Sequence, residues 1–340
     1  MGTQLIQGMK ESTTRYLLSI CIPTYNRWEY LQNLLEGLLP QMQRFHDKVS
    51  LHITDNASTD NTIEIIKELS AKYEVDIDLY RQDENVGLDR NYDKASSMSD
   101  GKYTFILGDD DLLAPNFLKT ILDYIDKDEE YSLVHFNWIH GDDVYNCQYV
   151  QNRNYVPATY MPVGDFFMQF TASPNFTSAV IFNTKLWTLG LPKEGEFDGG
   201  GYWGFARILK GACLFQKPCV YHHYPLVIQR NPVRSFQTMM LYYMYHDMSK
   251  IFQIGDAYIP GLFDRWTSFF LNAGYGWFEC IAEDVSFYRE HRDEMKEFLN
   301  NEQLKVYDKI INARNPQKTY THWRYRRKLM GYLRKLRKLL

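Results

Sequence analysis

The chain alternates continuous apolar runs with segments in which apolar residues recur every three or four positions. The first run, residues 17–25, is almost wholly apolar, which is typical of a strand buried on both faces of a parallel sheet. Four leucines between positions 31 and 38 then follow a helical spacing, which predicts a helix with one apolar face. We expect Asn26 to cap this helix, with Glu29 completing a capping box.

The same alternation continues towards the middle of the chain. It predicts further strands at 51–54, 75–80 and 103–107, separated by helices at 63–69 and 90–98. Strands that alternate with helices in this way form a parallel, right-handed α/β sheet. Beyond residue 111 the order is less regular; there we expect helices at 115–125 and 202–210, extended segments at 132–138, 175–183 and 220–228, and mostly helix from 235 onward.

Polar residues stand where each of the first four predicted strands ends. The carboxyl ends of parallel strands share one edge of a sheet, and ligands of open α/β sheets bind there. The four strand ends carry Thr24-Tyr25-Asn26, Asp55-Asn56, Arg81-Gln82-Asp83 and Asp109-Asp110-Asp111. The pattern therefore predicts one crevice lined by these side chains.

The three consecutive acids Asp109–Asp111 directly follow an apolar strand and Gly108. A cap for the helix predicted from Pro115 is the simpler interpretation, but a cap needs only one acid. Three carboxylates beside a glycine, which permits close approach, fit a divalent cation better. Mg²⁺ and Mn²⁺ prefer hard oxygen ligands, and Mg²⁺ is usually held by one or two carboxylates together with substrate phosphates. We therefore expect Mn²⁺ or Mg²⁺ and a nucleotide diphosphate at this site.

The composition is that of an ordinary folded protein and does not by itself indicate a function. Of the 340 residues, 45% are hydrophobic and 24% charged, and the five cysteines show neither a paired metal spacing nor a disulfide framework, which suits a reducing cytosol. The first residues lack the plan of a signal peptide, and the apolar segment 268–282 is too short to span a membrane. The 16% aromatic share is high; aromatic rings can stack on sugars, although core packing explains most of them.

Four stretches, SICIPTYNR, TDNASTDNT, ENVGLDRNYDKA and GKYTFILGDDDLLAP, occur in an order and spacing similar to glycosyltransferase family 2, whose members have the GT-A fold. Any one stretch alone is weak evidence, but four in order are specific. The resemblance covers residues 17–125 well, and the GDDD form is similar to the abequosyltransferase-like branch of bacterial surface-polysaccharide enzymes. It implies an inverting transfer of sugar from a nucleotide diphosphate, most simply a UDP-sugar.

The resemblance also implies roles for single residues. Asp55 would hydrogen-bond the base, and Asp110 would be the best metal ligand, because Gly108 stands where the family's first aspartate belongs. Asp109 would contact the ribose or the metal, and Asp111 the metal or its loop. Residues implied at the donor are Pro23, Thr24, Asn26, Asp55, Asp83, Arg90, Asn91, Asp109 and Arg230. A late His or Arg often reaches the diphosphate or metal in this fold, which makes His222 a metal candidate, with a structural histidine as the alternative.

The family also carries a catalytic acid just before a helix in the later part of the fold. Asp198 stands closest to the helix predicted from Tyr202, which makes it the candidate general base, with Glu196 as the second choice. An exposed charge on the glycine-rich loop 190–201 is an equally weighted interpretation. Tyr202 and Trp203 are candidates for an acceptor-sugar platform, with core packing as the alternative.

The last 23 residues, 318–340, hold nine of the 38 Lys and Arg residues and no acid, so the remaining 29 basic residues face all 42 acidic ones. Leucines recur there with helical spacing beside basic and aromatic side chains, which predicts an amphipathic helix that favours anionic lipid. Nucleic-acid binding, oligomerisation and packing on the acidic body are the alternatives, and no nucleic-acid motif supports the first.

Together the patterns predict an α/β chain of GT-A fold with a mainly parallel central sheet and a helical C-terminal region. We expect a catalytic domain at 1–232 (nucleotide half 15–125, acceptor half 126–232), a helical region at 233–317 and the membrane-associating helix at 318–340. The predicted enzyme extends a lipid-linked bacterial surface glycan at the inner face of the cytoplasmic membrane. We also expect it to form a homo-oligomer. The rivals are a sugar-1-phosphate nucleotidylyltransferase, whose GxGTR loop is absent, and a non-catalytic nucleotide-sugar or membrane-binding module.

Overall fold

The protein divides into two compact units in a computed structural model, and each is described by itself. The first comprises residues 1–232 and 254–262, and the second comprises 233–253 and 263–340. The structure describes residues 14–141, 147–149, 157–170, 176–191, 193, 202–230, 242, 246–273, 278–297, 299 and 301–325.

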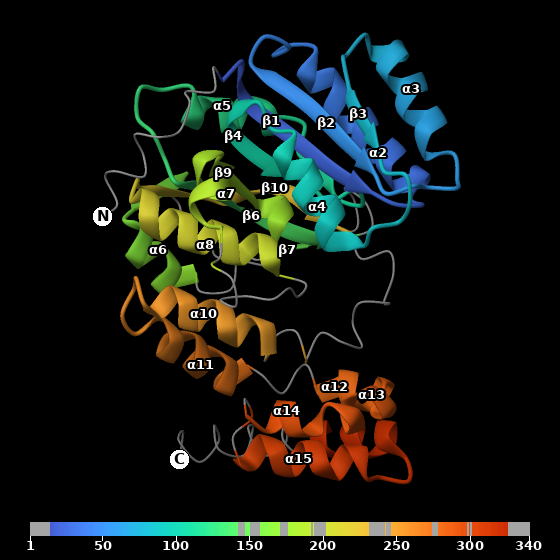
Figure 1. The fold of residues 1–340 in the computed structure, drawn as a ribbon, viewed down its shortest axis with the longest axis vertical. Coiled ribbons are helices and arrows are strands. Elements are labelled where there is room, and N and C mark those ends of the chain that lie inside the picture. The colour runs from blue at the N-terminus through green and yellow to red at the C-terminus, as the bar shows by residue number, and fades with distance from the viewer. Residues whose placement is uncertain are drawn as a thin grey trace. The chain divides into compact units, whose positions relative to one another are not determined.

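The first unit is built on one sheet of ten strands in its described part, in the order β3-β2-β1-β4-β9-β6-β10-β5, with β7 on β6 and β8 on β10 (Figure 1). The strands are β1 (Tyr16–Thr24), β2 (Val49–Asp55), β3 (Asp78–Arg81), β4 (Gly101–Ile106), β5 (Leu112–Leu113), β6 (Leu133–Gly141), β7 (Cys147–Tyr149), β8 (Ala158–Met161), β9 (Val180–Asn183) and β10 (Cys219–Gln229). Parallel pairs join β3, β2, β1 and β4, and another joins β6 to β10. The predicted mainly parallel α/β sheet is therefore confirmed.

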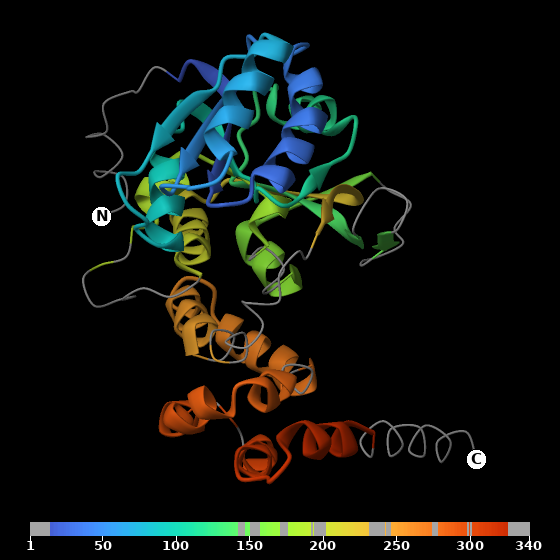
Figure 2. The same cartoon turned by 90° about the vertical axis from the view of Figure 1, so that its right-hand side faces the viewer.

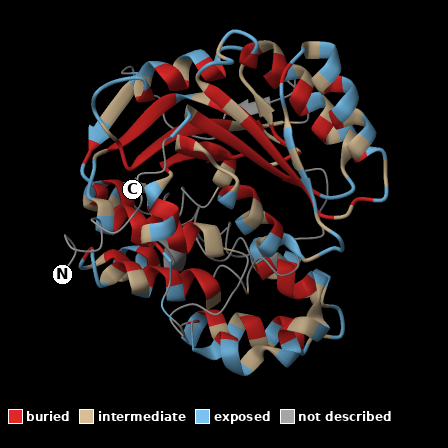
Figure 3. Ribbon diagram, turned by 45° about the horizontal axis from the view of Figure 1, so that its top comes forward, coloured by how far each residue is buried: buried red, intermediate tan, exposed pale blue. Residues whose placement is uncertain are grey.

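Helices cover both faces of this sheet (Figures 1 and 2). The helices of the unit are α2 (Trp28–Met42), α3 (Thr62–Tyr73), α4 (Leu88–Ser97), α5 (Phe117–Ile125), α6 (Val163–Phe170), α7 (Lys185–Leu189) and α8 (Trp203–Phe215). The apolar faces of α2, α3 and α5 join β1, β2 and β4 in one buried cluster. On the other face α4 packs against β1 and β2 and against α8. Figure 3 shows the central strands buried along their length, as their unbroken apolar runs predict.

Two local predictions are wrong. The segment 175–183 is not one strand, because Thr177–Ala179 forms a 3₁₀ turn before β9 begins, and β9 runs antiparallel to β4 and β6. Asn26 does not cap α2: the helix begins at Trp28, and Asn26 takes a left-handed φ of 50°. Its side-chain oxygen instead accepts a hydrogen bond from the backbone N–H of Thr59 at 2.8 Å, which joins the loops after β1 and β2.

The second unit is helical in its described part. The helix α10 (Met248–Asp256) contributes to both units. The remaining helices are α11 (Leu262–Ala273), α12 (Glu279–Glu283), α13 (Val285–Glu290), α14 (Arg292–Lys296) and α15 (Asn301–Ile311), and residues 316–325 are also helical. No helix among the described residues is both long and apolar enough to cross a membrane.

Candidate active site

The carboxyl ends of β1, β2 and β4 bring the predicted donor residues together. In the parallel register Thr24 lies beside Asp55, so the last residues of β1 and β2 are neighbours. The loop after β4 then turns towards them, and the Thr24 hydroxyl donates a hydrogen bond to Asp109 Oδ2 at 2.8 Å. The strand ends therefore share one edge of the sheet, as their sequence predicts. Pro23 is buried one residue earlier in β1, beside Thr54.

The acid triad Asp109–Asp111 lies in a largely buried position. The exposed fractions of Asp109 and Asp111 are 5% and 3%, and the side chain of Asp110 is 21% exposed. Burial raises the pKa of Asp109 to about 6, even though Arg27 acts against the rise. Burial and the charge of Asp110 together raise the pKa of Asp111 to about 8, and burial raises the pKa of Asp110 as well. Such a cluster is poorly compensated when fully ionised, and a multivalent cation would favour its charged form.

Gly108 allows this crowding. A Cβ atom at that position would lie 3.0 Å from Asp111 Oδ2 and 3.1 Å from Asp110 Oδ1, which is tighter than ordinary packing. The backbone N–H of Gly108 donates to the hydroxyl of Ser178 at 2.9 Å. The 3₁₀ turn that replaces the first part of the predicted strand thus holds the acidic loop in place.

Two arginines accompany the triad. The Nη1 atom of Arg27 lies 3.2 Å from Asp109 Oδ1 and 3.1 Å from Asp110 Oδ2. Arg230, which follows β10, donates from its backbone N–H to Asp111 Oδ1 at 3.2 Å and from its guanidinium to the backbone oxygen of Asp110. The predicted proximity of Arg230 to this region is therefore observed, whereas the sequence had assigned no role to Arg27.

The residues present fit a divalent cation bound together with a diphosphate. Among the described residues no three Asp, Glu, His or Cys side chains form a ready metal cage. Asp109 and Asp110 nevertheless converge on one positive group, the Arg27 guanidinium, and both offer hard oxygen donors. A cation held by one or two carboxylates takes its remaining ligands from water and substrate phosphates.

His222 is not placed to join these acids, and its assignment as a metal ligand is wrong. It lies in the first half of β10, beside Phe136, whereas Arg230 follows the opposite end of that strand. Its Nδ1 atom lies 2.8 Å from the hydroxyl of Tyr124 on α5. Burial lowers the pKa of His222 to about 4, as expected of a neutral structural histidine.

The residues implied at the base and ribose fall into two groups. Asp55 is fully buried and accepts from the backbone N–H of Ser58 at 3.1 and 3.2 Å, and Arg81 Nε lies 3.3 Å from its Oδ2. Asp83 and Arg90 are exposed, and their side chains have no hydrogen bond or ion pair with the described residues. The carboxylate of Asp55 is therefore already paired within the protein, whereas the side chains of Asp83 and Arg90 are available to a ligand.

Asn91 joins α4 to the carboxyl ends of the sheet. It is buried, and its Nδ2 donates to the backbone oxygen of Thr54 at 3.1 Å and to that of Thr24 at 3.5 Å. Its Oδ1 atom has no hydrogen-bond partner among the described residues. An unpaired buried acceptor is costly, so the role of Asn91 in the structure rests on the two bonds that its Nδ2 donates.

The predicted base and acceptor residues are only partly within the described structure. Asp198 and Glu196 lie outside the described residues, as does most of the loop 190–201. Tyr202 directly precedes α8 and Trp203 is its first residue; the centre of the Trp203 ring lies 5.8 Å from the guanidinium of Arg207. Their role as an acceptor platform therefore stays a prediction.

Arg207 links the donor helix α4 to α7 and α8. It is buried, and its guanidinium lies 2.5 Å from Asp93 Oδ1 and 4.1 Å from the ring centre of Trp187. Trp187 Nε1 donates to the same Asp93 oxygen at 3.2 Å. Because α4 carries Arg90, this contact ties the donor side to the helix that follows the loop 190–201.

Sequence reasoning missed Arg27, Ser178 and Arg207, and it placed Arg81 at the crevice without its ion pair with Asp55. Arg27 and Arg81 lie near strand ends on the predicted crevice, so pairing each with the acids of that edge would have found them. Ser178 and Arg207 act across long sequence separations, and no local pattern indicates them.

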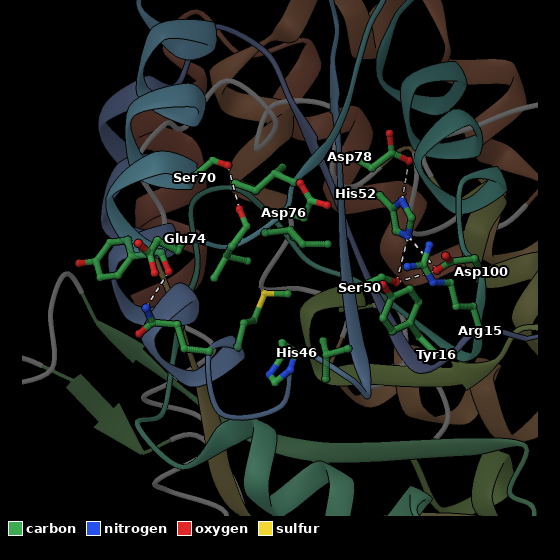
Figure 4. A pocket seen from close by; sticks show the side chains of 17 residues that line it. Arg15, Tyr16, His46, Ser50, His52, Ser70, Glu74, Asp76, Asp78 and Asp100 are labelled. Carbon is green, nitrogen blue, oxygen red and sulfur yellow. Dashed lines mark hydrogen bonds and ion pairs between the residues drawn. The ribbon is translucent and has the colours of Figure 1, made fainter.

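A cavity of about 1030 Å³ lies at the opposite, amino-terminal edge of the sheet (Figure 4). Beside it His52 Nδ1 lies 3.0 Å from Asp78, and His52 Nε2 lies 3.2 Å from Asp100. Ser50 and Ser19 donate to the same Asp100 oxygen at 2.7 and 3.0 Å. This network joins β1, β2, β3 and the start of β4, so we interpret it as a stabilising contact.

Asp100 should make the stability of the sheet depend on pH. Burial alone would raise its pKa, but hydrogen bonds from Ser50, Ser19 and His52 outweigh burial and lower it. Its contribution is therefore present above the ordinary value of 3.8 and is lost as the pH falls below that value. Asp100→Asn should flatten the fall in thermal midpoint between about pH 5 and 3, whereas Asp76→Asn, an exposed change on the same cavity, should leave it unaltered. Identical acid profiles for all three proteins would contradict this role.

Known glycosyltransferases are similar to this chain in sequence. Residues 19–188 match the model of "Glycosyl transferase family 2". Abequosyltransferase RfbV of Salmonella typhimurium is 30% identical over 243 residues, which cover 65% of this chain and 68% of that protein. An uncharacterised glycosyltransferase of Mycoplasma pneumoniae is 30% identical over 114 residues, 34% of this chain and 38% of that protein.

Solved structures share the fold at low identity. Residues 1–349 of TarS from S. aureus, in complex with UDP-GlcNAc, align with a TM-score of 0.52 and 14% identity, over 91% of this chain and 92% of that chain. The mannosyltransferase PcManGT from Pyrobaculum calidifontis, in complex with GDP-Man and Mn²⁺, aligns with a TM-score of 0.53 and 15% identity, over 94% and 90%.

The sheet, together with the family match and the relatives, defines a glycosyltransferase of GT-A fold. The chain belongs to glycosyl transferase family 2, and within it to the abequosyltransferase-like kind. The resemblance seen in the four sequence stretches is therefore confirmed.

Proposed function

We propose that this glycosyltransferase is metal-dependent and inverting, and that it uses a UDP-sugar to extend a lipid-linked bacterial surface glycan. The observation that carries the metal assignment is the convergence of Asp109 and Asp110 on a single cationic group, beside Thr24 and Arg230. Mn²⁺ in the related fold of PcManGT and the UDP-sugar in that of TarS support the cofactor and nucleotide.

The donor would lie along the carboxyl edge of β1, β2 and β4. Asp109 and Asp110 would hold the divalent cation, which supplies positive charge to the leaving diphosphate. Arg230 orients the acidic loop by binding its backbone, and Asn91, which holds α4 to the backbone of Thr24 and Thr54, would face the donor as the family resemblance implies. Arg90, exposed on α4, is free to turn towards the donor.

Inversion requires one base on the acceptor side. Asp198 would accept the proton of the acceptor hydroxyl as its oxygen bonds to the anomeric carbon. The bond from that carbon to the phosphate oxygen breaks at the same time, and the diphosphate leaves with the electron pair. Glu196 is the second candidate for this proton transfer, and Tyr202 and Trp203 remain candidates for contacting the acceptor sugar.

The lipid-linked acceptor is supported by the similarity to abequosyltransferase RfbV and by the basic C-terminal segment. The described part of this segment, 318–325, is helical, and 326–340 lies outside the described residues. On this basis we propose that the protein acts at the inner face of the cytoplasmic membrane. A homo-oligomer stays a prediction.

Deleting residues 318–340 should release the protein from anionic liposomes while donor binding is retained. The segment carries nine basic residues. Each basic residue near an anionic membrane contributes about 1 kcal/mol to the free energy of binding. Co-sedimentation with vesicles of phosphatidylglycerol measures this, and neutral vesicles serve as the control. Equal sedimentation of the truncated and full chains would contradict the membrane role.

The direct test is product formation. The protein is incubated with Mn²⁺, a panel of nucleotide-sugars and an extract of bacterial lipid-linked glycans, and the released nucleoside diphosphate is measured. The proposal expects release from a UDP-sugar that depends on both Mn²⁺ and the extract. Nucleotide binding without any release would instead favour a non-catalytic nucleotide-sugar-binding module.

A further inference from the structure

The two arginines beside the acid triad are held very differently. Arg230 is 8% exposed, and its guanidinium donates to the backbone oxygens of Asp110 and, at 3.2 Å, of Tyr30. It also lies over the Tyr30 ring, 5.1 Å from the centre. Arg230 is thus fixed by backbone atoms and leaves the side-chain oxygens of Asp110 untouched.

Arg27 is bound by the carboxylates themselves. One atom, Nη1, lies within 3.2 Å of an oxygen of both Asp109 and Asp110, and the side chain is 38% exposed. The other oxygen of Asp109 is already occupied by Thr24. Arg27 therefore holds the remaining oxygen of Asp109, Oδ1, together with Oδ2 of Asp110.

A divalent cation and this guanidinium cannot share the same two oxygens. A metal ion bound by a carboxylate oxygen lies about 2.0–2.2 Å from it, and a guanidinium nitrogen at hydrogen-bond distance from the same atom would then face a like charge at close range. Arg27 has a long, partly exposed side chain and can move away, whereas Arg230 cannot without losing its backbone contacts.

We propose that Arg27 is an exchangeable counter-cation: it neutralises Asp109 and Asp110 in the donor-free protein, yields them to the divalent cation, and then pairs with the donor diphosphate. This inference rests on the proposed function and adds to it the order in which Arg27 changes its anionic partner. The metal alone must displace an ion pair, but metal and diphosphate together give the displaced arginine a new anionic partner. Metal and nucleotide should therefore strengthen each other's binding, and this coupling is reciprocal.

The test measures Mn²⁺ binding rather than turnover. Free Mn²⁺ is counted by electron paramagnetic resonance during titration of wild type, Arg27→Gln, Arg27→Lys and Arg44→Gln, each with and without UDP. Arg44 is an exposed arginine just beyond α2 and serves as the matched control. Thermal unfolding confirms that each variant is folded.

Arg27→Gln should bind Mn²⁺ alone about tenfold more tightly than wild type, because no ion pair has to be broken. Its gain in Mn²⁺ affinity on addition of UDP should fall by about the same factor. Arg27→Lys keeps a charge but not the guanidinium, so its Mn²⁺ affinity should lie between those of wild type and Arg27→Gln, and Arg44→Gln should match wild type.

Equal or weaker Mn²⁺ binding by Arg27→Gln in the absence of nucleotide would overturn the inference. If UDP binding still depends on Mn²⁺ in that case and is lost in Asp110→Asn, the proposed metal site stands and only the role of Arg27 fails. Absence of Mn²⁺ binding by every protein, with and without UDP, would contradict the metal site and the inference together.

Discussion

Asp110→Asn should abolish Mn²⁺-dependent nucleotide binding and lower the transfer rate by on the order of a hundredfold or more, because it removes a charged metal ligand while keeping the side-chain shape. Asp110 is the most exposed acid of the triad, and one of its oxygens faces the same group as Asp109. Calorimetric titration of UDP with Mn²⁺ and the release of nucleoside diphosphate measure the two effects.

Asp123→Asn is the matched control for this change. Asp123 is an exposed residue of α5 whose carboxylate pairs with Lys119, and the same loss of charge there should leave binding and transfer unaltered. An Asp110→Asn protein that binds UDP and Mn²⁺ as wild type does would rule out Asp110 as a metal ligand.

Asp198→Ala should retain donor binding and lose about 10²–10⁴-fold in transfer rate, the usual effect of removing a general base. The acid stands five residues before α8 in the chain, and its assignment rests on the family resemblance. The measurement pairs calorimetric donor binding with single-turnover transfer, so that binding and chemistry are separated.

Glu196→Ala is the natural comparison, since it removes a carboxylate two positions away on the same loop. We expect Glu196→Ala to keep most of the transfer rate. Loss of transfer in Glu196→Ala with full activity in Asp198→Ala would reverse the two assignments, and full activity in both would place the base elsewhere.

The sequence predicted the donor edge because its determinants are local. Unbroken apolar runs identify buried parallel strands, and parallel strands place their carboxyl ends together, so Thr24, Asp55 and Asp109 had to meet. The apolar pattern also located α2, α3 and α5, whose buried faces follow the spacing of their leucines and isoleucines.

The errors arose where the outcome depends on distant residues. Asn26 has the chemistry of a helix cap, but the neighbouring loop offers it the N–H of Thr59. His222 stands shortly before Arg230 in the chain, yet along an extended strand eight residues span about 26 Å before bends, which separates it from the acids. The antiparallel insertion of β9 beside β4 and the contact of Ser178 with Gly108 likewise involve partners about 70 to 80 residues apart, which no local pattern contains.

The central claim is a nucleotide-diphosphate site that depends on a divalent cation, and calorimetric titration of wild-type protein tests it most directly. UDP, CDP, GDP and dTDP are each titrated with and without Mn²⁺. The account predicts that UDP binds, and that it does so only when Mn²⁺ is present. Binding of no nucleotide under either condition, or equal binding with and without Mn²⁺, would contradict it.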